Sequence, residues 1–176
     1  TFHRRNSSTL GTSSDGDWSW TEDVTGLAIT SNHVHIDAGT AGRARAEKDL
    51  SSADHYVQAE LTGSAFEVAY AGVLARRSSV AATFYAFYAN PADDDSQIVK
   101  VVAGTATQLE QQFTGTTASE IDSLRVSGST LRAFRNGVLI HSLTDTAITG
   151  FVRTGIESVN TSPADVTLDT FEAGDV

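Results

Sequence analysis

The dipeptide Asn136-Gly137 constrains the fold of this chain more than any other feature. Asparagine and glycine both tolerate a positive φ, which a type I′ turn requires at its two central residues. The dipeptide lies between two runs of strand-forming residues, L-R-A-F-R before it and V-L-I-H after it. The sequence therefore predicts a tight β-hairpin centred on this turn.

A two-residue turn also fixes which residues of the two strands lie opposite one another. The expected pairs are Arg135 with Val138, Phe134 with Leu139, Ala133 with Ile140 and Arg132 with His141. Because side chains alternate along a strand, one face should be directed to the core and the other outward. The core face would carry Leu131, Ala133, Val138 and Ile140, and the outer face Arg132, Phe134, Leu139 and His141. This outer face is too polar for a core and too apolar for simple contact with solvent.

The rest of the chain is also typical of strands. About a dozen short segments show period-two alternation or enrichment in β-branched and aromatic residues, and no segment of useful length has helical periodicity. With no cysteine among 176 residues, the core must be stabilised by apolar burial and not by disulfides. These features predict one domain over residues 1–176, an all-β, two-sheet antiparallel β-sandwich.

Three details refine this expectation. The segment Val80–Ala89 carries four aromatic residues in five positions, which cannot all face one core, so both faces of that strand must be covered. Phe2 and Phe171 are isolated aromatic residues in the first and last strands, and we expect them to lie side by side and close a sheet edge. Gly72 indicates a bulge or a close approach of two backbones.

The charge of the chain excludes several classes of partner. Its formal charge is −10, from 22 acidic and 12 basic residues. Nucleic acid and anionic lipid both require a basic surface, so neither is expected as a partner. No apolar run reaches the ~20 residues that a membrane-spanning helix needs. We therefore expect a neutral partner, and neither nucleic acid nor a membrane.

Several segments together resemble a known family. In chain order they are F-H-R-R-N-S-S-T-L-G, W-S-W followed by L-A-I-T-S-N-H-V, A-G-V-L-A-R, L-R-A-F-R-N-G-V-L-I with T-D-T-A-I-T-G, and L-D-T-F-E-A-G-D. They are similar to the concanavalin A-like lectin/glucanase jelly rolls, most of all to the LamG-like modules of bacterial extracellular proteins and of bacteriophage tail or capsid-surface proteins. The resemblance implies a jelly roll whose concave sheet binds sugars or proteins, and it does not imply catalysis.

Glycoside hydrolases of this fold place Glu, Asp and Glu at alternate or near-alternate strand positions, since retaining chemistry needs an acid and a nucleophile close together. Glu120 and Asp122 match the first two members of that pattern. The third member is absent, because Leu124 and Arg125 stand where the second glutamate should be. We therefore expect no catalytic residue in this segment, and a solvated strand end instead.

Two segments offer weak candidates for metal ligands. His33, His35 and Asp37 alternate along a strand, so their side chains would share one face and could bind zinc or iron. A half-exposed strand with polar residues outward explains the same pattern, and no fourth ligand is evident. Asp93 and Asp95, in an acidic loop, could bind calcium through oxygen atoms. That loop lacks the spacing of a dedicated calcium loop, so a solvated acidic loop is favoured and no metal or cofactor is expected.

The aromatic residues are better candidates for a binding site. Rings stack on the apolar C–H faces of sugars, and nearby polar groups give orientation. The candidate platforms and hydrogen-bond donors are Trp18, Trp20, Tyr85, Tyr88, Phe134, Arg132 and His141. The alternative for each ring is a place in the core, where most aromatic residues of a sandwich lie.

The favoured hypothesis is a non-enzymatic recognition or surface module of a phage virion or another extracellular assembly. Its partner would be a cell-surface glycan or a neighbouring structural subunit. One alternative is a polysaccharide-acting glycoside hydrolase that uses another pair of acids among Glu60, Glu67, Glu110, Glu120 and Asp122. Another is a decoration protein whose amphipathic face is buried against a scaffold or a second copy of the chain, as in a homo-oligomer.

Overall fold

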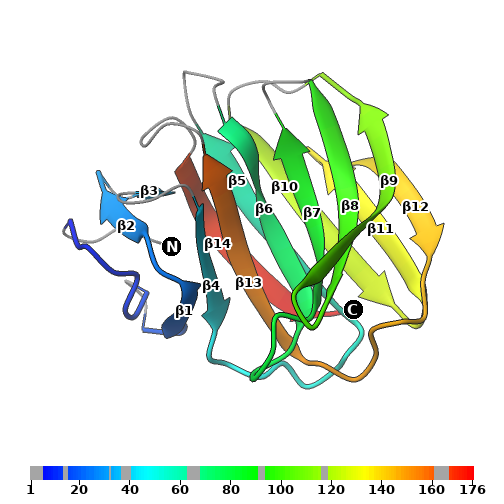
Figure 1. The fold of residues 1–176 in the computed structure, drawn as a ribbon, viewed down its shortest axis with the longest axis horizontal. Coiled ribbons are helices and arrows are strands. Elements are labelled where there is room, and N and C mark those ends of the chain that lie inside the picture. The colour runs from blue at the N-terminus through cyan, green and yellow to red at the C-terminus, as the bar shows by residue number, and fades with distance from the viewer. Residues whose placement is uncertain are drawn as a thin grey trace.

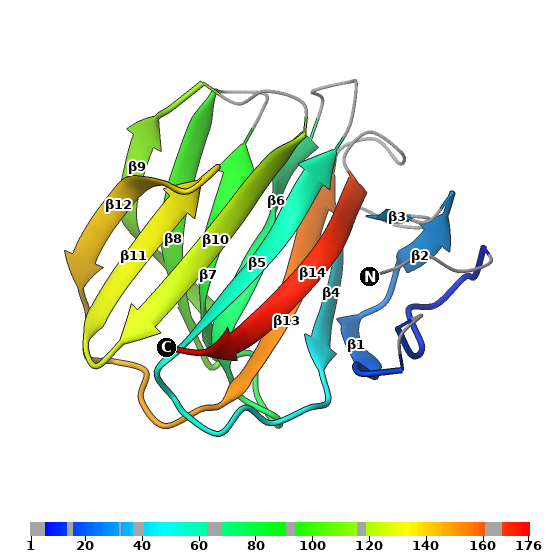
Figure 2. The ribbon, with the colours of Figure 1, turned by 180° about the vertical axis from the view of Figure 1, so that it is seen from behind.

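The computed structural model describes residues 6–13, 16–31, 33–36, 41–62, 68–90, 94–115, 119–160 and 167–176. Two antiparallel sheets of seven strands each form a jelly-roll β-sandwich (Figures 1 and 2). The predicted fold class is therefore confirmed. Four residues on which expectations were placed lie outside the described residues: Phe2, Asp37, Glu67 and Asp93. The described part contains no helix long and apolar enough to cross a membrane.

The sheet nearer the viewer in Figure 1 is called the front sheet here. Its strand order is β1 (Trp20–Val24), β4 (Ala41–Ala46), β13 (Arg153–Asn160), β6 (Val68–Arg77), β7 (Phe84–Asn90), β8 (Asp95–Val102) and β9 (Thr105–Phe113). The other, nearer the viewer in Figure 2, is the back sheet. Its order is β12 (Val138–Thr144), β11 (Thr130–Arg135), β10 (Glu120–Ser127), β5 (His55–Thr62), β14 (Thr167–Asp175), β3 (His33–Ile36) and β2 (Leu27–Thr30).

The main core lies between the sheets, where alternate residues of each strand meet. In β10, for example, Leu124 and Val126 are fully buried, whereas Ile121 and Arg125 are exposed on the other face. This is the period-two pattern that a half-buried strand requires. The hydrophobic effect along these alternating faces holds the two sheets together without a disulfide.

Strand β7 is buried on both faces, as its four aromatic residues predicted. Tyr85 and Phe87 belong to the core between the sheets. Phe84 and Tyr88 belong to a second, smaller apolar cluster on the outer face of the front sheet. The strand begins at Phe84 and not at Val80, because residues 78–83 form a loop. This second cluster is the floor of the candidate site described below.

The turn at Asn136-Gly137 is confirmed, but the register beyond it differs from the prediction. Asn136 has φ 50° and Gly137 φ 78°, as a type I′ turn requires. Phe134 pairs with Leu139 as expected, and then a bulge shifts the register so that Ala133 pairs with His141. A one-residue shift exchanges the two faces of a strand. His141 is therefore fully buried. Val138 lies before the bulge and pairs with Arg135 as predicted, but it is 67% exposed and not in the core.

The last strand, β14, contacts residues from the beginning of the chain. β14 lies between β5 and β3, and its Phe171 makes edge-to-face contacts with Trp18 and Trp20, at centroid distances of 5.4 and 4.8 Å. Both indoles therefore lie on the same side, as the W-S-W spacing predicted. The partner expected for Phe171 was Phe2, outside the described residues.

Gly72 is a site of close backbone approach. The sequence predicted either this or a bulge. A Cβ atom at this position would lie 1.9 Å from the carbonyl oxygen of Phe87 on β7. No side chain fits there without moving the neighbouring strand. Gly72 thus allows β6 and β7 to approach each other beside Tyr88, its pairing partner.

Candidate functional site

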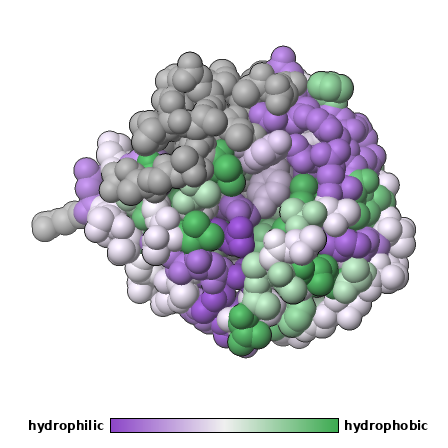
Figure 3. Space-filling view, viewed as in Figure 1, coloured by the Kyte–Doolittle hydropathy of each residue, from purple (hydrophilic) through white to green (hydrophobic). Residues whose placement is uncertain are grey.

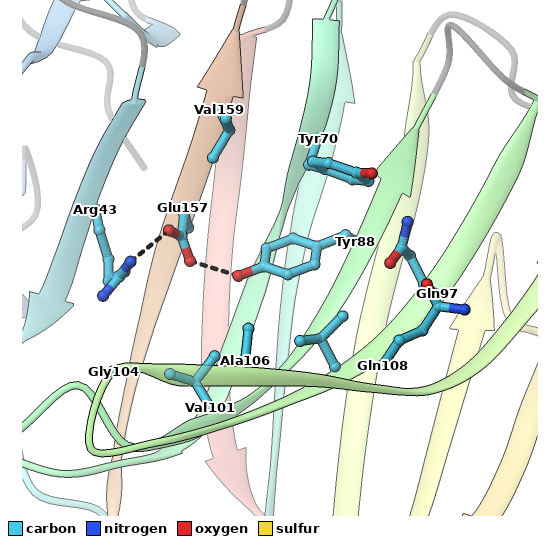
Figure 4. A pocket seen from close by; sticks show the side chains of 11 residues that line it. Arg43, Tyr70, Tyr88, Gln97, Val101, Gly104, Ala106, Gln108, Glu157 and Val159 are labelled. Carbon is cyan, nitrogen blue, oxygen red and sulfur yellow. Dashed lines mark hydrogen bonds and ion pairs between the residues drawn. The ribbon is translucent and has the colours of Figure 1, made fainter.

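A cavity with a volume of about 310 Å³ lies on the outer face of the front sheet (Figure 4). It lies over β13, β6, β7 and β8, and the β8–β9 hairpin crosses it as a wall. Figure 3 shows this face hollowed near its middle, with hydrophilic and hydrophobic side chains beside the hollow. The lining residues are Arg43, Tyr70, Tyr88, Gln97, Val99, Val101, Gly104, Ala106, Gln108, Glu157 and Val159.

Two tyrosine rings form the aromatic part of this front pocket. The rings of Tyr70 and Tyr88 lie 5.9 Å apart between centroids, at an interplanar angle of 52°. Val99 and Val101, which belong to the same apolar cluster as Tyr88, extend the apolar floor. Rings and methyl groups of this kind contact the C–H faces of a sugar, and the amides of Gln97 and Gln108 at the rim can exchange hydrogen bonds with its hydroxyls.

A charged pair fixes the tyrosine at the floor. The hydroxyl of Tyr88 donates a hydrogen bond to Oε2 of Glu157, and Nη2 of Arg43 donates to Oε1 of the same carboxylate at 2.7 Å. Burial raises the pKa of Tyr88 well above its ordinary value, and the neighbouring Glu157 charge adds to the shift. Tyr88 therefore stays protonated, and Arg43 neutralises the one carboxylate among the described lining residues.

The wall of the pocket is held by hydrogen bonds at the tip of the β8–β9 hairpin. The backbone N–H of Gly104 donates to the carbonyl of Ala82 at 2.8 Å. The N–H of Ala103 donates to Oγ1 of Thr83 at 3.0 Å. Ala103 and Gly104 both have positive φ, 48° and 85°, so the hairpin turns tightly at this point. The wall is consequently anchored to the loop before β7.

Of the aromatic residues predicted to contact a ligand, Tyr88 lies in the front pocket and Phe134 lies on the outer face of the back sheet. The expectation that Trp18 and Tyr85 present their rings at the surface is wrong, because both are buried in the core, as is Trp20. The hydroxyl of Tyr85 donates to Asp145 and accepts from the N–H of Ile148. Burial and the bond to Asp145 raise the pKa of Tyr85 to about 12.

His141 is also not a surface residue, as a result of the bulge in β12. Its Nε2 lies 2.9 Å from Oγ of Ser96, and its Nδ1 lies 3.5 Å from Oε2 of Glu110. The imidazole ring packs edge-to-face against the Phe87 ring, at 5.8 Å between centroids. Burial lowers the pKa of His141, although Glu110 opposes the shift. The order Ser–His–Glu matches a nucleophilic triad, but Ser96 and His141 are both fully buried, so no substrate reaches them in this structure.

Glu120 and Asp122 face the inside of the sandwich, not its outer face. Asp122 accepts two hydrogen bonds from the guanidinium of Arg135, at 3.0 and 3.1 Å, and Glu120 lies 2.9 Å from the same group. Burial raises the pKa of Asp122, and Arg135 opposes the shift. All three side chains are buried. The expected solvated strand end is therefore wrong, and the two acids instead stabilise a buried arginine.

The metal candidates do not converge among the described residues. His33 and His35 project outward from β3, as predicted, and Nε2 of His33 lies 3.9 Å from Oδ2 of Asp169. Asp95 is buried and accepts a hydrogen bond from Gln111. In the part of the chain that the structure describes, no three His, Asp or Glu side chains form a group that could hold a metal ion.

Five polar or aromatic residues of the front pocket were not found from the sequence. They are Arg43, Tyr70, Gln97, Gln108 and Glu157. Arg43 and Glu157 are separated by 114 positions in the chain, and only the pairing of β4 with β13 brings them together. Tyr70 carried a usable signal, because it lies two residues before Gly72 in an alternating segment and therefore shares its face.

No known protein family matches the sequence, and no curated protein matches it. Solved structures do match the fold. The carbohydrate-binding module CBM66 from Bacillus subtilis has a TM-score of 0.75 and 13% identity over 89% of this chain and 95% of its own. The VIP36 exoplasmic/lumenal domain bound to Ca²⁺ and Man3GlcNAc has a TM-score of 0.67 and 9% identity, over 92% of this chain and 85% of its own. A Bacillus licheniformis β-glucanase has a TM-score of 0.65 and 8% identity, over 98% of each chain.

These likenesses confirm the concanavalin A-like jelly roll that the sequence segments resembled. At 8–13% identity they establish the fold alone. The three structures include two sugar-binding proteins and one enzyme, so the fold is compatible with either activity.

Proposed function

We propose that this chain is a non-catalytic carbohydrate-binding module and that it binds sugar in the front pocket. The observation that supports this most directly is the pair Tyr70 and Tyr88 on a floor of valines, with fixed polar groups at the rim. This is the composition of a small-ligand site: mostly apolar and aromatic, with a few placed polar groups.

The pocket suits a neutral sugar. Glu157 is paired with Arg43, so the floor offers hydrogen-bonding groups without a net charge. The volume of about 310 Å³ lies at the lower end of the ~300–1,000 Å³ usual for ligand pockets. We therefore expect one or two sugar units in the pocket and the remainder of a glycan outside it.

The distribution of acids favours binding over hydrolysis. Retaining and inverting glycosidases both need two carboxyl groups across the scissile bond, and Glu157 is the one carboxylate among the described lining residues. Glu120 and Asp122 are engaged with Arg135 inside the sandwich. The competing hypothesis, a glycoside hydrolase, is supported by the β-glucanase likeness over the whole length of both chains.

The proposal is tested by affinity electrophoresis and calorimetry with a panel of neutral polysaccharides. Tyr70→Ala, at a half-exposed ring, should weaken binding at least about tenfold, since stacking and shape complementarity are both lost. Val138→Ala, at an exposed side chain on the opposite sheet, is the matched control and should bind like the original chain. The proposal fails if Tyr70→Ala and Gln97→Ala both leave binding unchanged. Release of reducing sugar by the original chain, lost in Glu157→Gln, would instead support the hydrolase.

We further propose that the module acts outside the cell, as part of an extracellular assembly or a phage virion. The sequence segments resembling LamG-like modules of such assemblies support this, as does an acidic, cysteine-free composition. A structural subunit or a second copy of the chain would then be a further partner. Size-exclusion chromatography with light scattering distinguishes a monomeric lectin from a homo-oligomer, and a monomer at all concentrations would count against the decoration role.

A further inference from the structure

The outer face of the back sheet carries a second concentration of aromatic and polar side chains. Among the described residues, no other strand covers this face over β11, β10, β5 and β14 in Figure 2. The register places Tyr56, Arg125 and Arg132 side by side across β5, β10 and β11. The adjacent row runs from Glu172 through Gln58 and Ser123 to Phe134 and Leu139. We call these two rows the back face.

The Tyr56 ring is oriented by its neighbours on β14 and β5. A Cβ atom on Gly174, its pairing partner on β14, would lie 3.0 Å from Cε1 of the ring, so the ring lies against the bare backbone of this glycine. The Tyr56 hydroxyl donates to Oε1 of Glu172, and Nε2 of Gln58 donates to Oε2 at 3.0 Å. The hydrogen bond to Glu172 raises the pKa of Tyr56. One side of the ring therefore rests on the sheet while the phenol stays protonated.

Phe134 provides a second ring on the same face. The guanidinium of Arg125 lies over it, 5.8 Å from the ring centroid, and both residues line a hollow that also includes Tyr56, Gln58, Ser123 and Glu172. The hollow has a volume of about 400 Å³. Cation–π contact orients the arginine while its N–H groups remain available to an acceptor.

The two arginines of the back face differ from the others in the molecule. In the part of the chain that the structure describes, Arg43, Arg45, Arg76, Arg77, Arg135 and Arg153 each contact a carboxylate. Arg125 and Arg132 contact none there, and they lie directly opposite each other on neighbouring strands. Like charges in that position destabilise a sheet. In a chain of net charge −10, this pair brings two positive charges together on neighbouring strands without a carboxylate contact among the described residues.

We propose that the back face binds an acidic saccharide, such as a glycan that contains uronic acids, at a site separate from the front pocket. Tyr56 and Phe134 contact the sugar faces, and Arg125 and Arg132 bind its carboxylates. Adjacent strands are about 4.8 Å apart, which brings the two guanidinium groups within reach of charges on one sugar or on consecutive sugars. A densely charged polyanion such as nucleic acid is disfavoured, because the rest of the surface repels it.

Affinity electrophoresis in gels that contain polygalacturonate tests the proposal, with neutral dextran gels for comparison. Arg132→Gln should weaken binding to polygalacturonate about tenfold, the loss of a charge-assisted contact. Lys48→Gln removes one exposed positive charge elsewhere and should have little effect. Tyr56→Ala should also weaken binding, whereas binding of neutral sugar at the front pocket should be unchanged in all three variants. Because polygalacturonate binding and neutral-sugar binding are measured separately, this proposal can fail while the proposed function stands, and the reverse.

Other occupants give different results. Equal losses in Arg132→Gln and Lys48→Gln would show diffuse electrostatic attraction and overturn the proposal. Binding to polyglutamate as tight as that to polygalacturonate would indicate an acidic protein segment, and self-association abolished by Arg132→Gln would indicate a second copy of the chain; either result overturns it. Dextran sulfate is a densely charged polyanion without carboxylates, so binding to it as tight as that to polygalacturonate would show attraction by charge alone and would also overturn the proposal.

Discussion

The front pocket and the back face place the same pair of groups in opposite settings. In each, a tyrosine hydroxyl donates to a glutamate, Tyr88 to Glu157 and Tyr56 to Glu172. In the pocket the ring is buried, the carboxylate is neutralised by Arg43, and a hairpin forms a wall. On the back face the glutamate also accepts from neutral Gln58, and the ring lies open beside unpaired arginines. The comparison indicates that the surroundings, and not the Tyr–Glu pair, are what would distinguish the two proposed ligands.

The largest expected difference concerns the glycines beside the two tyrosines. Gly72→Val should destabilise the protein by about 3 kcal/mol, because the new Cβ would overlap a backbone carbonyl that cannot move without distorting β7. Gly174→Val meets only the edge of the Tyr56 ring, which can rotate away, so it should cost less than about 1 kcal/mol. Its effect should appear as weaker binding to polygalacturonate.

Urea unfolding measures both variants. Equal losses of stability in the two variants would mean that Tyr56 is held as rigidly as the floor of the front pocket. The back face would then not differ from the front pocket in rigidity.

Removal of the tyrosine hydroxyls should give a smaller difference in stability between the two sites, again with the larger loss at the front pocket. Tyr88→Phe leaves a buried carboxylate with one partner fewer, which should reduce the free energy of unfolding by about 1–3 kcal/mol. Tyr56→Phe affects an accessible pair and should change it by less than about 0.5 kcal/mol. Thermal and urea unfolding of the two single variants test this. A larger loss at Tyr56 would reverse the assigned roles.

The smallest effect is expected from pH and should act on the fold and not on either ligand site. Burial lowers the pKa of His55 below its ordinary 6.5, with further contributions of both signs from its neighbours. Its Nδ1 donates to the carbonyl of Ser52, and its Nε2 accepts from the N–H of Arg76 at 3.0 Å. A proton on Nε2 would break this second bond. His141 is shifted in the same direction.

The unfolded chain therefore takes up protons at a higher pH than the folded one, and stability falls as pH decreases from about 6.5 towards the folded-state pKa. Urea unfolding between pH 7.5 and 5 should show this decline, and His55→Gln should reduce its slope. A slope unaffected by His55→Gln and by His141→Gln would exclude these two groups as its source.

Local chemistry made much of the fold predictable. The Asn136-Gly137 turn, the two-sided burial of β7 and the shared face of Trp18 and Trp20 all follow from residue types and spacing. The bulge in β12 does not, because the residue inserted there, Ile140, is an ordinary strand former, and the bulge reversed the placement of His141. The pairing of Arg43 with Glu157 was equally inaccessible, since it depends on which distant strands become neighbours.

The tethered tip of the β8–β9 hairpin has a consequence for how this protein can diversify. Its backbone is secured to the loop before β7, while Val102 and Thr105 beside the turn are exposed. Substitutions there would reshape the mouth of the cavity without disturbing the aromatic floor beneath. The sugar preference proposed for the front pocket could therefore change through a few surface positions, with little loss of stability.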